Sequence, residues 1–285
     1  MKNMSLNSAG GHVCGRRRSI PGGRAPFIPG LFGALLMGGA VALAQPQPAV
    51  QPAQNLRIIT GDKTLLDDRG PERGFHAIFN GKDLSGWEGN PKLWSVKDGA
   101  ITGQTTADNP AKGNTFLIWT NGTVGDFQLR CSFRLVPGDS KGFANSGIQY
   151  RSRVLDPTNW VVGGYQADME AGPNYTGILY EERFRGIMAL RGEKVVWTPD
   201  DKKQVVGSVG TAAEIEGALK KDGWNDYVII AKGNHLQQFI NGRQTVDVTD
   251  DCEAKRAMSG VLALQLHAGS PMMAQFKDIR LKALK

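Results

Sequence analysis

Residues 127–135 read FQLRCSFRL, in which every second residue is apolar. Alternation with a period of two is typical of a strand with one face on a core and the other toward water. Two apolar runs at 227–231 and 236–240 precede Asn241-Gly242, which is followed by TVDV at 245–248. Asn-Gly between such runs is a strong hairpin signal.

More strands are expected at 261–267 and 274–281, and one short helix at 212–220. Many short strands separated by Gly and Asn turns predict an all-β fold, a jelly-roll β-sandwich. Residues 73–285 are uniform in composition and contain no internal repeat, so we expect them to form a single domain.

The first 44 residues have the pattern of a secretory signal peptide. Arginines at 16–18 and 24 precede an apolar, Gly-rich segment at 27–41, and Ala42-Leu43-Ala44 offers a cleavage site. The segment is too short and too interrupted by Gly and Pro to predict a membrane span. We expect an exported protein, periplasmic or extracellular, with residues 45–72 as a disordered linker whose first part is rich in Gln, Pro and Ala.

Most of the positive charge belongs to this leader. The formal net charge of the 285 residues is +7, and residues 1–44 carry five positive and no negative side chains, which leaves +2 for the remainder. No basic stripe interleaved with aromatic residues is present either, so nucleic-acid binding is not expected.

Two cysteines remain beyond the leader, Cys131 and Cys252. One disulfide between them is an open alternative. However, Cys131 is in phase with the apolar residues of the 127–135 strand, which favours a buried free thiol. The sequence has no CxxC, HExxH or Cys/His cluster, so a structural zinc site is not expected.

The stretch GYQADME at 164–170 carries the candidate chemistry. As a strand it places Gln166, Asp168 and Glu170 on one face and three apolar residues on the other. Carboxylates held by a rigid sheet are suited to acid/base chemistry on a sugar, with Asp168 and Glu170 as the leading base and acid. The alternative is a half-buried strand whose polar face is merely solvated.

Other polar residues are predicted to join this face. His267 is in phase with Gln265, which makes it a candidate proton shuttle, with a structural histidine as the alternative. Gln149 and Arg151 alternate with apolar neighbours, and Arg151 would bind a sugar oxygen or neutralise the carboxylates. Trp160, in a loop rich in Pro, Asn and Gly, could stack on a sugar face.

Several motifs resemble the 3-keto-disaccharide hydrolase family. They are FNGKDLSGW at 79–87, WSVKDG at 94–99, NSGI at 145–148 with Arg151, WN at 224–225, the Asn-Gly hairpin, and Gly260 through FKDIR at 276–280. Their order covers about residues 74–284, and the resemblance implies a concanavalin A-like jelly roll.

The resemblance also implies a reaction. The substrate would be a glycoside whose C3 hydroxyl a partner sugar 3-dehydrogenase has oxidised to a ketone. A base then removes the acidified C2 proton, the C1 substituent leaves by β-elimination, and water can add to the product. A divalent metal could stabilise the enolate, but the sequence shows no ligand set for one, and no cofactor is predicted.

The segment TGILY, which ends at Tyr180, resembles the family's TGxxY. It implies that Tyr180 donates to the substrate and that Glu181 or Glu182 completes the site. The favoured alternative for these glutamates is pairing with Arg183 or Arg185 at an exposed edge.

Many family members carry Tyr-Glu-x-Gln where this chain has YQAD at 165–168, so the amide and the carboxylate are exchanged. A retaining glucanase would need a nucleophilic Glu where Gln166 stands, and an amide cannot form the glycosyl ester. A non-catalytic, lectin-like carbohydrate-binding module is the remaining alternative. The favoured interpretation is a 3-keto-glycoside lyase or hydrolase.

Overall fold

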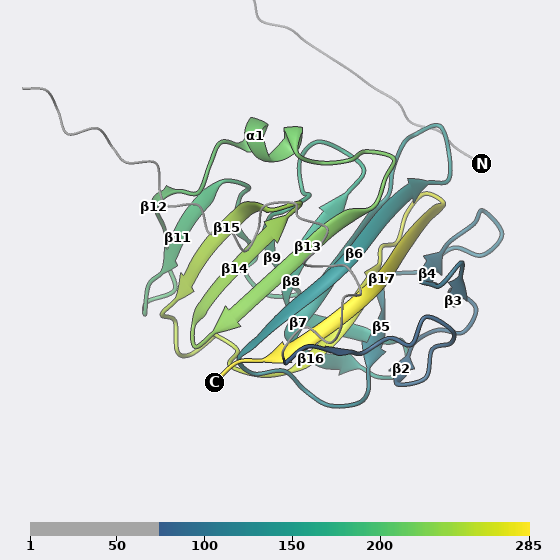
Figure 1. The fold of residues 1–285 in the computed structure, drawn as a ribbon, viewed down its shortest axis with the longest axis horizontal. Coiled ribbons are helices and arrows are strands. Elements are labelled where there is room, and N and C mark those ends of the chain that lie inside the picture. The colour runs from purple at the N-terminus through teal and green to yellow at the C-terminus, as the bar shows by residue number, and fades with distance from the viewer. Residues whose placement is uncertain (1–73) are drawn as a thin grey trace, which may run out of the picture. The chain divides into compact units, whose positions relative to one another are not determined.

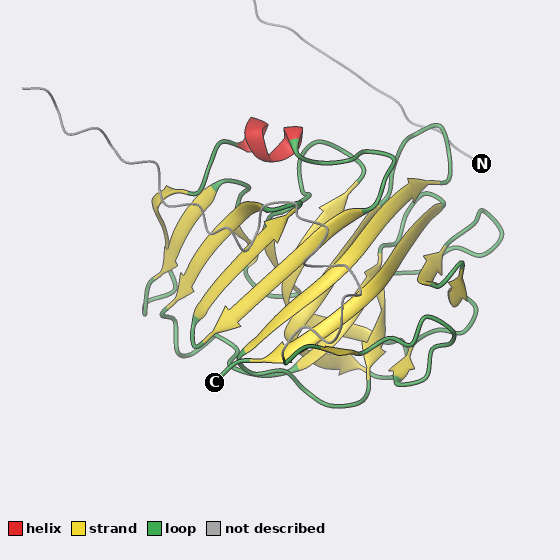
Figure 2. Cartoon of the chain, in the orientation of Figure 1, coloured by secondary structure: helices red, strands yellow, loops and turns green. Residues whose placement is uncertain are grey.

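The computed structural model describes residues 74–285 as a sandwich of two β-sheets. The secretory signal predicted for residues 1–44 and the linker predicted for 45–72 lie outside this range. Figure 1 shows one sheet in front of the other, and Figure 2 shows how little of the domain is helical. The two sheets confirm the predicted all-β jelly-roll fold.

The larger sheet has ten strands. In spatial order they are β12 (Lys203–Ser208), β11 (Glu193–Trp197), β15 (Arg243–Asp250), β14 (His235–Ile240), β13 (Asn225–Lys232), β6 (Phe127–Pro137), β17 (Met272–Ala283), β4 (Ala100–Gln104) and β3 (Trp94–Lys97), with β1 (His76–Ala77) paired to β17. Only the β11–β15 pair is parallel among the described strands of this sheet. The β17–β6 pair is the longest ladder of this sheet.

The smaller sheet has seven strands and carries the candidate site. Its order is β10 (Gly186–Ala189), β9 (Leu179–Glu182), β8 (Val161–Glu170), β7 (Asn145–Asp156), β16 (Val261–Leu266), β5 (Thr115–Trp119) and β2 (Trp87–Glu88). β8 and β7 lie inside the sheet, and each pairs with a strand on both sides. Hydrogen bonds on both edges therefore fix their backbones, and with them the positions of their side chains.

The core lies between the sheets. Leu129 and Phe133 of β6 and Leu264 of β16 belong to one buried cluster that spans both layers. Phe127 from the larger sheet packs edge-on against Tyr150 from the smaller, with 5.9 Å between ring centroids. Burial of this apolar surface is the main force that holds the layers together.

The predicted local elements are confirmed. The alternating stretch 127–135 lies in β6, and the predicted helix is α1 (Ala212–Gly217), which begins with a capping box between Thr211 and Glu214. Asn241 and Gly242 both have positive φ, 48° and 82°, in the turn that joins β14 to β15. A two-residue hairpin turn needs this conformation, which Asn and Gly tolerate.

Cys131 and Cys252 are both buried free thiols, as favoured over a disulfide. Desolvation raises the pKa of the Cys131 thiol far above its ordinary value, so this thiol is inert at neutral pH.

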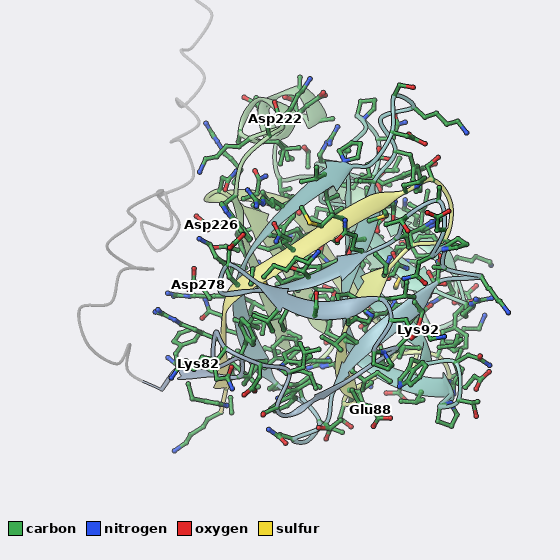
Figure 3. All side chains as sticks on the ribbon, turned by 90° about the vertical axis from the view of Figure 1, so that its right-hand side faces the viewer. Lys82, Glu88, Lys92, Asp222, Asp226 and Asp278 are labelled. Atoms are coloured by element: carbon green, nitrogen blue, oxygen red, sulfur yellow. The ribbon has the colours of Figure 1, made fainter. Side chains whose placement is uncertain are left out.

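Charged side chains cover the outside of the domain. Figure 3 shows the labelled residues Lys82, Lys92, Asp222 and Asp278 at its periphery, projecting outward. Within residues 74–285, no helix has the length and apolar character needed to cross a bilayer.

Candidate active site

The alternation of β8 places polar side chains on the outer face of the seven-stranded sheet. Tyr165, Ala167 and Met169 lie in the core, as predicted. Gln166 and Asp168 therefore project from the opposite face. They are nevertheless only 2% and 5% exposed, because neighbouring side chains on that face cover them.

A pocket of about 270 Å³ opens on this face. That volume is at the lower end of the range for ligand sites and suits a small sugar. Its polar lining residues come from four strands and three adjoining segments: Asn114, Asn145, Gln166, Asp168, Tyr175, Tyr180, Glu182, Gln265 and His267. Five of the residues predicted from the sequence therefore meet here: Gln166, Asp168, Tyr180, Gln265 and His267.

Asp168 is the buried acid of this pocket. Gln166 Nε2 donates to its Oδ1 at 3.0 Å. No Lys or Arg forms an ion pair with it within residues 74–285. Burial raises the pKa of Asp168 well above its ordinary value, with Glu170 and Glu182 adding to the rise and the Gln166 hydrogen bond opposing it. A carboxyl group with a raised pKa is a stronger base once ionised.

Gln166 is fixed in position by its neighbours. Gln149 Nε2 donates to Gln166 Oε1 at 2.8 Å, and the two residues are register partners on β7 and β8. Gln149 thus shares the polar face, as predicted, but lies beneath the pocket rather than in it. Gly147 leaves room for the Gln166 side chain, since a Cβ there would lie 2.5 Å from Gln166 Cγ and Cδ.

Gly147→Ala is therefore expected to destabilise the domain by about 1–3 kcal/mol, the usual range for overpacking. Adding Gln166→Ala in the same chain removes the colliding atoms and should restore most of that loss. Urea unfolding of both variants and of Gln166→Ala alone measures the coupling. Additive effects of the two changes would contradict the contact.

Of the two glutamates that the sequence offered for the site, Glu182 is the one that lines the pocket. It shares a face with Tyr180 along β9, whereas Glu181 between them turns inward to an ion pair with Arg185. The Glu182 carboxylate lies 3.4 Å from Gln265 Nε2 and 3.4 Å from Asn114 Nδ2. The predicted pairing of a glutamate with Arg185 is confirmed for Glu181, but that pair is buried rather than at an exposed edge.

The alternation of side chains along β9 was the signal that could have favoured Glu182 over Glu181. If Tyr180 faces a substrate, the residue two positions later on the same strand faces it as well. The Cα partner of Glu182 on β8 is Gly164, which has no side chain. Arg183, half exposed, contacts the same carboxylate at 3.3 Å.

Two buried acceptors at the pocket have no partner among the described residues. They are Asn145 Oδ1 and Gln265 Oε1. An unpaired buried carbonyl oxygen is costly unless a ligand or water donates to it. Together with the two carboxylates, these atoms make the pocket rich in acceptors, which is the complement of a ligand with several hydroxyl groups.

Tyr180 and His267 supply donors. Partial burial, with the carboxylates of Glu182 and Asp168, raises the pKa of Tyr180, so its hydroxyl stays protonated. His267 Nδ1 faces the carbonyl of Ala268, and its ring packs edge-on against Phe143 at 5.4 Å. Because a carbonyl oxygen only accepts, Nδ1 is the donor in this contact, and Nε2 is the ring nitrogen available to a ligand.

Glu170, predicted as a catalytic acid, lies outside this pocket. Its Oε1 accepts from the backbone N–H groups of Asn174 and Tyr175, at 2.5 and 2.8 Å. The carboxylate therefore shapes the loop after β8 and lines a different pocket. Glu170 is therefore not placed to act as an acid on a ligand in this pocket.

Arg151, predicted to bind substrate, also lies elsewhere. Its guanidinium donates to the carbonyls of Gly125 and Gly233 at 2.8 and 2.6 Å and pairs with Asp126 at 2.9 Å. These partners belong to loops at the ends of larger-sheet strands, so Arg151 ties the two layers together. It lines a separate pocket at the rim.

Trp160, predicted to stack on a sugar, does not line the pocket. It covers a small apolar cluster that includes Phe116, Ile118 and Val162 on the same sheet face. Its indole N–H points to Glu88 Oε1 at 3.3 Å. Trp160 is thus a covering residue beside the pocket.

The pocket does not present a metal site. Within residues 74–285 no group of three or more His, Cys, Asp or Glu side chains is placed to hold a metal ion. The residues present therefore do not fit the divalent metal considered from the sequence, and no step below is routed through one.

Fold and site together define a jelly-roll protein with a carbohydrate-sized acidic pocket. The family model of the 3-keto-alpha-glucoside-1,2-lyase-like domain matches residues 74–282, and the chain belongs to this family. It is thus a carbohydrate-active protein of the glycoside hydrolase and lyase type. The comparison with curated proteins gives no match.

Solved structures with a similar fold include a candidate glycosyl hydrolase from Parabacteroides distasonis, 20% identical, covering 75% of this chain and 95% of that one with a TM-score of 0.47. The carbohydrate-binding module CBM66 from Bacillus subtilis is 14% identical and covers 70% and 96%, with a TM-score of 0.45. A Bacillus subtilis protein of unknown function with a galectin-like fold is 11% identical and covers 70% and 90%, also with a TM-score of 0.45.

Proposed function

We propose that this protein cleaves 3-keto-glycosides by removing the C2 proton and eliminating the C1 substituent. The observation that carries the proposal is Asp168, a buried carboxyl without a cation partner among the described residues, in a pocket whose other acceptors suit hydroxyl groups. Membership of the family, whose description names a 3-keto-glucoside lyase, supports the same reaction.

In this mechanism ionised Asp168 takes the proton from C2, and the C–H electrons form an enolate with the C3 ketone. Tyr180 donates a hydrogen bond to the enolate oxygen, which stabilises the developing charge. The C1–O bond then breaks as the C1–C2 double bond forms. His267, as the imidazolium with its second proton on Nε2, gives that proton to the departing oxygen and becomes neutral, while the C2 proton stays on Asp168.

The first products are an alcohol and a 2-hydroxy-3-keto-glucal. Addition of water across C1 and C2 would convert the glucal to the 3-keto sugar, so that the net reaction is hydrolysis. Glu182 is placed to orient this water or a sugar hydroxyl, since its carboxylate already bridges the amides of Asn114 and Gln265.

Chromogenic 3-keto-glucoside and the unoxidised glucoside, each incubated with the purified protein, provide the test. Release of the aglycone from the keto substrate alone is expected, because only a C3 ketone acidifies C2. Equal release from both would contradict the elimination. No release from either, with a thermal shift on adding glycans, would favour the carbohydrate-binding module.

We also propose that the protein is exported and acts outside the cytoplasm, on the basis of the leader pattern at residues 1–44. A sugar 3-dehydrogenase would supply the substrate, because the ketone must be made before elimination can occur. Cell fractionation, with the chain found outside the cytoplasm and shortened near Gln45, is the expected result.

A further inference from the structure

Four buried side chains on β7 and β8 form a continuous chain of hydrogen bonds that ends at Asp168. Ser152 Oγ donates to Gln149 Oε1 at 2.6 Å, Gln149 Nε2 to Gln166 Oε1 at 2.8 Å, and Gln166 Nε2 to Asp168 Oδ1 at 3.0 Å. All four are at most 5% exposed. We refer to Ser152, Gln149, Gln166 and Asp168 as the amide relay.

The relay has a direction, and the direction matters for Asp168. Each amide presents a donor at one end and an acceptor at the other, so the two glutamines must turn together. With every donor pointing toward Asp168, its Oδ1 receives a hydrogen bond, which favours the carboxylate. In the reverse direction Gln166 Oε1 would face Oδ1, and the pair could form a hydrogen bond only if Asp168 kept its proton.

Ser152 is the first residue of the relay, and the hydrogen bond that its hydroxyl donates sets this direction. Its hydroxyl lies 3.1 Å from the carbonyl oxygen of Tyr150 and 3.4 Å from that of Tyr165. The hydroxyl is therefore a donor in surroundings that otherwise offer acceptors. Without it, Gln149 Oε1 loses the donor that fixes the orientation of its amide.

We propose that Ser152, which does not line the pocket, is a positioning residue whose hydroxyl keeps Gln166 donating to Asp168 and so keeps Asp168 ready to accept a proton. The catalytic consequence rests on the proposed role of Asp168 as the base. The direction of the relay itself does not, because it follows from the hydrogen bonds of the free protein.

Other ionisable groups also face Asp168. On the smaller sheet they are Glu170, Tyr180, Glu182 with Arg183 beside it, and His267. From the larger sheet comes Tyr227, whose hydroxyl lies 3.5 Å from the Asp168 carbonyl oxygen. Among the described residues, none of these groups hydrogen-bonds to the Ser152 hydroxyl, whose contacts are Gln149 and two backbone carbonyls. A change at Ser152 therefore acts through the relay.

Carbon NMR titration of the Asp168 carboxyl in the free protein tests the proposal without any substrate. In Ser152→Ala the midpoint is expected to rise by about one pH unit, the equivalent of one hydrogen bond to a carboxylate. Ser152→Cys, with a weaker donor, should give a smaller rise and serves if the alanine variant does not fold. Ser132→Ala removes another buried hydroxyl, bonded to Asp226 in the larger sheet, and should leave the midpoint unchanged.

The pH dependence of kcat should shift in the same direction as the titration of Asp168. The low-pH limb of kcat on the keto substrate is expected to move upward by the same amount, with KM and the high-pH plateau kept. A midpoint that stays or falls in folded Ser152 variants would overturn the proposal. A raised midpoint in a protein with no activity on 3-keto-glycosides would uphold the relay and reject the proposed function instead.

Discussion

Asp168→Asn is expected to lower kcat on a 3-keto-glycoside by about 10²–10⁴-fold, the usual contribution of a general base. The amide keeps the shape of the side chain and can accept the Gln166 N–H through its own oxygen, so the pocket should be retained. It cannot take the C2 proton. Steady-state kinetics, with sugar binding measured by calorimetry, separates lost chemistry from lost binding.

The same variant should be more stable than the wild type at neutral pH. Burial raises the pKa of Asp168 in the folded state above the unfolded value of about 3.9. As the pH rises, the unfolded chain therefore loses this proton first. The stability contributed by the protonated carboxyl is complete below the unfolded pKa and is lost as the pH rises through the folded pKa. Asparagine has no proton to lose, so its advantage should appear on going from pH 4 to pH 8.

Full activity in folded Asp168→Asn would place the base elsewhere, with His267 the next candidate. A stability difference that does not change with pH would contradict a raised pKa of this buried carboxyl in the folded state. Asp226→Asn, on a half-buried carboxyl of the larger sheet, is the matched control.

Arg151→Met is expected to destabilise the domain by about 2–6 kcal/mol, because each backbone carbonyl left without its donor costs about 1–3 kcal/mol and Arg151 donates to two of them. The substitution leaves the carbonyls of Gly125 and Gly233 without their donor and Asp126 without its cation. Chemical denaturation followed by tryptophan fluorescence measures the loss.

Arg153→Met is the matched control. Arg153 is two residues further along β7, exposed, and stacked on Phe184 at 4.4 Å. An exposed cation–π contact contributes about 0.5–1 kcal/mol, so a small effect is expected. Equal losses in the two variants would contradict the role of Arg151 as a tie between the layers.

Periodicity was sufficient to predict much of the fold and part of the site. The alternation of β6 and the Asn241-Gly242 turn follow from local chemistry, and both are confirmed. The same reasoning placed Gln166 and Asp168 on one face of β8, because nothing interrupts the alternation there.

The period-two argument failed at Arg151 because β7 is irregular there. Its pairing with β8 shifts register between Tyr150 and Arg153, and Arg151 has a positive φ of 47°. A bulge redirects the side chains that follow it, so Gln149 stays on the polar face while Arg151 turns to the rim. A single sequence carries no signal for that shift.

The predicted position of Glu170 was wrong for a different reason, and the sequence could not choose between Glu181 and Glu182. Both outcomes depend on what lies across the sheet or in the next loop, not on the strand's own period. The Glu170 carboxylate accepts from two backbone N–H groups in the loop after β8, which the alternation of the strand does not reveal. Glu182 is held over the pocket by Gln265 and Asn114, which are remote from it in sequence and are brought to it by the fold.

The fate of the C2 hydrogen tests the proposed elimination most directly. A chromogenic 3-keto-glucoside carrying deuterium at C2 is cleaved in ordinary water, and the sugar product is analysed by mass spectrometry, with unreacted substrate from the same tube as the control for spontaneous exchange. The proposed mechanism predicts that the product has lost its deuterium while the unreacted substrate retains it. A product that keeps deuterium at C2 would show direct displacement at C1 and would contradict proton removal by Asp168.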